Sequence, residues 1–195
     1  NVTGVVIGER TGDELCINWN KNESVSGYII EQNRNGSWVR IARIADKNVT
    51  TYRVAGLSSS TMYQFRIRAF DFDGSTALYS GYTLVSGKTN PATISGLIIG
   101  GRASDALRLN WNRNAEASGY IIEQNRNGSW VRIARIADPS TTTYRVEGLE
   151  PSTTYQFRIK VFGVDGSTVI YSEYQNVSGR TAPTNVTGVV IGGRA

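Results

Sequence analysis

The side chains that most often perform catalysis are scarce in this chain. It has no histidine among its 195 residues, which removes the commonest general base and the commonest metal ligand. Its single cysteine, Cys16, cannot form an internal disulfide, and Arg108 stands at the matching position 92 residues later. Because a position that accepts arginine is typical of the surface, we predict that Cys16 faces solvent and is not a nucleophile.

The acidic residues show no catalytic or metal-binding spacing. Asp71 and Asp73 lie beside Gly74 in a polar turn, but the matching turn keeps only Asp165. Since calcium takes six or more oxygen ligands, a turn-forming role is the better prediction. Nothing resembles a zinc ligand set, a phosphate loop or a serine triad, so we expect no enzyme activity, no cofactor and no metal site.

The chain consists of two ungapped copies of one unit. At an offset of 92 residues, 58 of 92 positions are identical, and residues 26–46 recur unchanged at 118–138. Recent duplication explains that identity most simply, and a surface used repeatedly is the alternative. We predict one domain at 1–90, a second at 91–182, and the start of a third repeat at 183–195.

Size and charge bound the kind of protein. A unit of this length buries about 60–65% of its surface, which allows one modest core and no deep internal cleft. The net charge of +5 is slight over two units, and no stretch of apolar residues is long enough to span a membrane. We therefore expect neither a nucleic-acid partner nor membrane insertion.

Alternating apolar and polar residues predict seven short strands in each unit and no helix. In the first unit these strands are expected at 2–8, 14–20, 27–33, 38–44, 50–54, 61–70 and 79–89. Asn35-Gly36 between two of them predicts a hairpin, because both residues tolerate positive φ. This pattern favours a sandwich of two sheets.

The order of landmarks resembles the fibronectin type III family. Trp19 precedes Gly-Tyr-Ile-Ile-Glu at 27–31, Tyr-Arg-Val at 52–54 and Tyr-Gln-Phe-Arg-Ile at 63–67, and the second copy matches. The resemblance implies an all-β fold of two tandem seven-stranded immunoglobulin-like sandwiches, followed by the first strand of a third. It also implies core tryptophans (Trp19 and Trp111) and corner tyrosines (Tyr63 and Tyr155) whose hydroxyls bond to the preceding loop.

The same resemblance implies a candidate ligand face on the outside of the larger sheet. In the first copy this face comprises Ile29, Glu31, Trp38, Arg40, Arg66, Arg68, Phe70 and Tyr82. In the second copy it comprises Ile121, Glu123, Trp130, Arg132, Arg158, Lys160, Phe162 and Tyr174. The rings could stack on sugars or on partner side chains while the cations donate hydrogen bonds. Alternatively, cations and rings pack into a ladder that stabilises the domain without any ligand.

The resemblance extends to tandem modules of bacterial secreted and cell-surface proteins. It implies an extracellular, non-catalytic spacer or scaffold that accompanies polysaccharide-degrading enzymes or adhesins, with other domains of the same polypeptide as partners. The alternative is a binding module for a carbohydrate or a surface protein. Short proline-containing linkers at 89–92 and 181–184 favour a semi-rigid array. The unpaired strand at 186–192 is expected to be mobile or to pair with a sheet edge.

Overall fold

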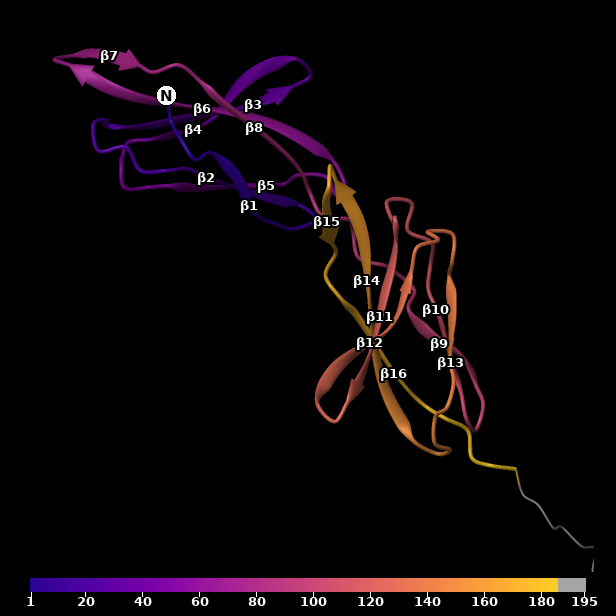
Figure 1. The fold of residues 1–195 in the computed structure, drawn as a ribbon. Coiled ribbons are helices and arrows are strands. Elements are labelled where there is room, and N and C mark those ends of the chain that lie inside the picture. The colour runs from indigo at the N-terminus through magenta and orange to yellow at the C-terminus, as the bar shows by residue number, and fades with distance from the viewer. Residues whose placement is uncertain (186–195) are drawn as a thin grey trace, which may run out of the picture. The chain divides into compact units, whose positions relative to one another are not determined.

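The computed structural model describes residues 1–185, and the regular structure in them is entirely β (Figure 1). They form two compact units, one built mainly from residues 1–92 and the other mainly from residue 93 onward. Among these residues there is no helix that could span a membrane. The strand predicted at 186–192, with its expected edge pairing, lies outside the described residues.

The first unit packs a sheet of three strands against a sheet of five. The smaller sheet has the order β1-β2-β5, with bounds β1 (Val6–Arg10), β2 (Glu14–Asn18) and β5 (Thr51–Ala55). The larger sheet has the order β4-β3-β6-β7, with β8 also paired to β6. Its bounds are β3 (Gly27–Arg34), β4 (Ser37–Ile44), β6 (Met62–Asp73), β7 (Thr76–Tyr79) and β8 (Thr83–Lys88).

The second unit repeats this topology. Its smaller sheet contains β9 (Ile98–Arg102), β10 (Leu107–Asn110) and β13 (Thr143–Val146). Its larger sheet contains β11 (Gly119–Arg126), β12 (Ser129–Ile136), β14 (Thr154–Asp165), β15 (Thr168–Tyr171) and β16 (Gln175–Arg180). The predicted pair of tandem β-sandwiches is therefore confirmed.

Each sandwich has its own apolar core, supplied by alternate residues of the facing strands. Leu15, Ile17 and Trp19 face Phe65 and Ile67 in the first core, and the counterparts of all five lie in the second. Trp19 is 4% exposed, which confirms the predicted core tryptophan. Each fully buried apolar side chain contributes about 1.5–3 kcal/mol, so these cores supply most of the driving force for folding.

Two local predictions about backbone and loop geometry are confirmed. In the β3–β4 turn, Asn35 and Gly36 have φ values of 53° and 87°, as a two-residue hairpin with both residues at positive φ requires. The Tyr63 hydroxyl accepts a hydrogen bond from the Ser58 N–H at 2.8 Å. The Tyr155 hydroxyl does the same in the second unit, also at 2.8 Å.

The first and last strands differ from their predicted bounds. The first begins at Val6 and not at residue 2, because Gly4 turns the chain with φ of 64°. The last is interrupted at residues 80–82, so that β7 and β8 pair separately with β6. At the interruption, the Ala69 N–H donates to the Ser80 Oγ at 3.0 Å, which supplies the bond that a continuous strand would have made.

Candidate functional site

The candidate face lies on the outer side of the larger sheet, where three strands bring its charged side chains together. β3 lies between β4 and β6, and Glu31 on β3 is opposite Arg66 on one side and Arg40 on the other. Because directly paired residues in a sheet project from the same face, these side chains share the outer surface.

Glu31 is the acidic centre of this face in the first repeat. Its Oε2 accepts hydrogen bonds from Arg66 at 2.5 Å (Nη2) and 2.7 Å (Nε), and its Oε1 accepts one from the Tyr82 hydroxyl at 2.8 Å. Burial opposes ionisation of Glu31, but the bonds from Tyr82 and Arg66 outweigh it and hold its pKa below the usual value. Burial and the bond to Glu31 raise the pKa of Tyr82.

Arginines and aromatic rings alternate across the face as a cation–π ladder of Trp38, Arg66, Tyr82, Arg68 and Tyr79. The Arg66 guanidinium carbon is 4.6 Å from the Trp38 ring centroid and 3.9 Å from that of Tyr82. Arg68 is 4.7 Å from Tyr82 and 4.1 Å from Tyr79. Each such contact contributes about 0.5–2 kcal/mol to stability. The face therefore contains the ladder of cations and rings that the sequence offered as an alternative to a ligand site.

The second repeat builds the same arrangement from its own residues. Arg158 bonds Glu123 at 2.6 Å and stacks on Trp130 at 4.4 Å and on Tyr174 at 3.8 Å. Lys160, which replaces Arg68, lies 4.7 Å from the Tyr174 ring. The Tyr174 hydroxyl donates to Glu123 at 2.9 Å.

Four residues predicted for this face are not accessible on it. Ile29, Phe70, Ile121 and Phe162 are 2–4% exposed. Ile29 lies between two arginines in the register, Arg43 on β4 and Arg68 on β6, and the long stems of such side chains shield apolar neighbours. Phe70 is stacked under Arg43 at 4.2 Å, and Phe162 under Arg135 at 4.3 Å.

Arg40 and Arg132 lie on the face but outside the ladder. Both are exposed, and within residues 1–185 neither forms an ion pair or stacks on a ring. Their charges are therefore directed toward solvent.

Sequence reasoning missed Arg43, Arg135 and Tyr79. Strict alternation from Trp38 and Arg40 places residue 42 outward, but a bulge pairs Ile30 with Ala42 and Glu31 with Arg40. The extra residue turns Arg43 outward. No signal in the sequence marks this bulge. Tyr79 was missed because residues 79–89 were predicted as one strand, in which alternation from Tyr82 places Tyr79 on the inner face.

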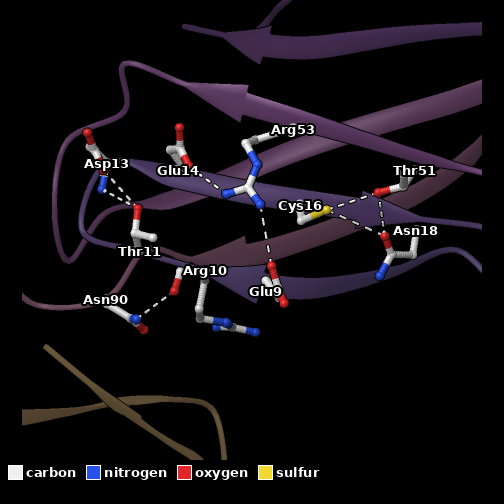
Figure 2. A network of polar contacts seen from close by, with 10 residues as sticks. All are labelled: Glu9, Arg10, Thr11, Asp13, Glu14, Cys16, Asn18, Thr51, Arg53 and Asn90. Carbon is white, nitrogen blue, oxygen red and sulfur yellow. Dashed lines mark hydrogen bonds and ion pairs between the residues drawn. The ribbon is translucent and has the colours of Figure 1, made fainter. Parts of the chain in front are cut away.

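The opposite sheet of the first repeat carries a separate polar network (Figure 2). Arg53 bonds Glu14 at 2.6 Å and Glu9 at 3.3 Å, so two carboxylates offset its charge. Cys16 was expected to be exposed, but its side chain is half-buried. Its Sγ lies 3.0 Å from the Thr51 Oγ1, which covers part of it.

Comparison with known proteins agrees with this architecture. The sequence model of the fibronectin type III domain matches residues 1–82 and 92–178. The chain belongs to the fibronectin type III family. Domains of this family are generally non-catalytic modules.

Relatives of the chain are large multidomain proteins. Exoglucanase B of Cellulomonas fimi is 23% identical over 93% of this chain and 17% of its own length. Receptor-type tyrosine-protein phosphatase eta of Mus musculus is 32% identical over 73% of the chain and 11% of its own length. Chitinase A1 of Niallia circulans is 24% identical over 90% of this chain and 25% of its own length. The chain thus spans a quarter or less of the length of these relatives.

Solved structures share the tandem fold. The FN1–FN3 domains of chicken CNTN1 align with a TM-score of 0.50 at 18% identity, over 93% of this chain and 67% of that one.

Proposed function

We propose that the two fibronectin type III repeats act as a non-catalytic, semi-rigid spacer between other domains of a larger secreted or cell-surface protein. The supporting observation is how few residues separate the two folded units. In the first unit the Asn90 N–H still donates to the Thr11 carbonyl at 2.8 Å. In the second, Ile94 is already part of the core and 3% exposed. Only residues 91–93 lie between, and Pro91 restricts the backbone further.

The end of the first unit is fastened by several bonds. The Asn90 amide donates to the Arg10 carbonyl at 2.8 Å (Figure 2), and the Ser60 N–H donates to the Asn90 carbonyl at 3.1 Å. Thr89 is fully buried, and its hydroxyl donates to the Ser58 carbonyl at 2.6 Å. Because Thr89 and Asn90 are held in the first unit by these bonds, they do not add flexible residues to the connection. This favours a stiff junction.

The second unit ends in the same way. The Thr181 N–H donates to the Thr153 carbonyl and the Ala182 N–H to the Ala103 carbonyl, each at 3.0 Å. These bonds support repeat boundaries near 90 and 182. The names of the exoglucanase and chitinase relatives support a place beside polysaccharide-degrading domains outside the cell.

Backbone ¹⁵N relaxation of the chain tests the spacer. Amides of both repeats should report one rotational correlation time, that of a particle of 195 residues. Two shorter times, each that of a particle about half as large, would mean that the repeats tumble independently, and the proposal would fail.

A binding module is the second candidate, favoured by the recurrence of the same outer face in both repeats. Retention on a panel of insoluble polysaccharides, compared with that of a Trp38→Ala/Trp130→Ala variant, tests it. Retention that the variant loses supports this candidate, and retention that it keeps rules out a role for these rings.

A further inference from the structure

Basic charge is concentrated on the outer face of the larger sheet in each repeat. Among the outward side chains of β3, β4 and β6 there are four cations, Arg40, Arg43, Arg66 and Arg68, and one carboxylate, Glu31. On β11, β12 and β14 the corresponding set is Arg132, Arg135, Arg158 and Lys160 against Glu123. These faces hold eight of the 21 basic residues and two of the 16 acidic ones, so their excess positive charge exceeds the net charge of the whole chain, +5.

Most of this charge in the first repeat is not neutralised. Glu31 is engaged by Arg66 and Tyr82, and within residues 1–185 no ion pair is formed by Arg40, Arg43 or Arg68. Arg40 and Arg43 are exposed, and the buried Nε of Arg68 has no hydrogen-bond partner.

The opposite sheet of this repeat is built differently. There Arg53 lies between Glu9 and Glu14 and bonds both (Figure 2). An anion approaching Arg53 on the smaller sheet meets two carboxylates for one guanidinium, whereas one approaching the larger sheet meets a positive field that steers it inward.

Two aromatic rings of the face, Tyr82 and Trp38, already stack on arginines. Tyr82 contacts the guanidinium groups of both Arg66 and Arg68, and Trp38 is stacked with Arg66. A neutral sugar that stacks on the ring faces covered by Arg66 and Arg68 would have to displace these arginines, whereas an anion can bind their outward N–H groups and leave the ladder intact. Single-stranded nucleic acid is disfavoured for the same reason, because its bases need free ring faces.

We propose that the outer face of each repeat binds a carboxylated polysaccharide through its unpaired arginines, without sugar stacking on the rings. The planar guanidinium fork matches a carboxylate in two-point contact. Two similar faces in tandem suit a polymer whose anions recur, because weak sites in series gain avidity. This inference deepens the binding-module candidate and is independent of the spacer.

Affinity electrophoresis of the chain through gels containing polygalacturonate tests the proposal. Fully methyl-esterified polygalacturonate is the matched control, since it keeps the sugar backbone and loses the charge. We expect retardation by the acidic polymer only, and a marked loss of it in high salt. Equal retardation by both polymers would overturn the proposal, as would retardation by a sulfated polymer with none by polygalacturonate.

Two double variants locate the surface. Arg40→Gln/Arg132→Gln removes two charges that lie outside the ladder and should weaken binding by roughly three- to tenfold. Arg53→Gln/Arg145→Gln removes the same number from arginines that are ion-paired on the smaller sheets, and should change binding less than about twofold. Equal losses in the two variants would show that only overall charge matters and would overturn the proposal. The relaxation experiment is unaffected by either result, so a failure here and a failure of the spacer are distinguishable.

Discussion

Tyr63 illustrates how much one hydroxyl contributes at the scale of single residues. Tyr63→Phe removes the acceptor of the Ser58 N–H bond at 2.8 Å, so we expect the free energy of unfolding of the first repeat to fall by about 1 kcal/mol. Chemical denaturation measures this change. Tyr79→Phe is the matched control, because its ring keeps the contact with Arg68 at 4.1 Å while its hydroxyl makes no hydrogen bond within the described residues. Equal losses in the two variants would contradict the corner role of Tyr63.

Glu31 makes the stability of the first repeat depend on pH. Burial opposes its ionisation, but the bonds from Tyr82 and Arg66 lower its pKa below the ordinary 4.5. A carboxyl whose folded pKa is lowered stabilises the fold above its unfolded pKa and loses that contribution as pH falls through the folded value. Glu31→Gln should therefore lower the Tm by roughly 4 °C near neutral pH. Below about pH 4 the difference in Tm between the variant and the native chain should become smaller. Calorimetry across this range checks it.

Glu9→Gln is the control for that titration. Glu9 also meets an arginine, but its side chain is 84% exposed, and exposed pairs contribute little. Its Tm should follow the native profile at every pH. If the Tm of Glu31→Gln also changed with pH in parallel with that of the native chain, ionisation of Glu31 would not be what makes stability fall at acidic pH.

At the scale of elements, the β3–β4 hairpin depends on its backbone more than on any contact. Gly36 has φ of 87°, and a Cβ added there would meet no atom within 4 Å. Gly36→Ala should thus cost about 1 kcal/mol through backbone strain alone. Gly101→Ala, at a glycine with ordinary φ whose nearest neighbour to a new Cβ is 3.5 Å away, should have little effect. Urea denaturation of the two variants compares them.

The elements also show what a sequence can and cannot predict. Asn35-Gly36, Trp19 and Tyr63 were predictable because each meets a local requirement: positive φ in a turn, a large apolar side chain directly after the end of a strand, or a hydroxyl near a loop. Arg43 was not, because its outward position follows from a bulge that shifts alternation by one residue. The burial of Ile29 was missed for a related reason, since the arginines that cover it come from two other strands.

At the scale of the whole molecule, the spacer depends on the junction between the units. Only residues 91–93 separate Asn90, which is hydrogen-bonded in the first unit, from Ile94, which is buried in the second. Inserting six Gly and Ser residues between Pro91 and Ala92 lengthens this connection. We expect the single correlation time to split into two shorter ones, while the Tm of each repeat stays unchanged, because both cores are intact. The same insertion between Gly74 and Ser75, in an exposed hairpin turn, should leave the correlation time essentially single. If the junction insertion left tumbling unchanged as well, the short connection would not be what couples the repeats, and the spacer proposal would lose its physical basis.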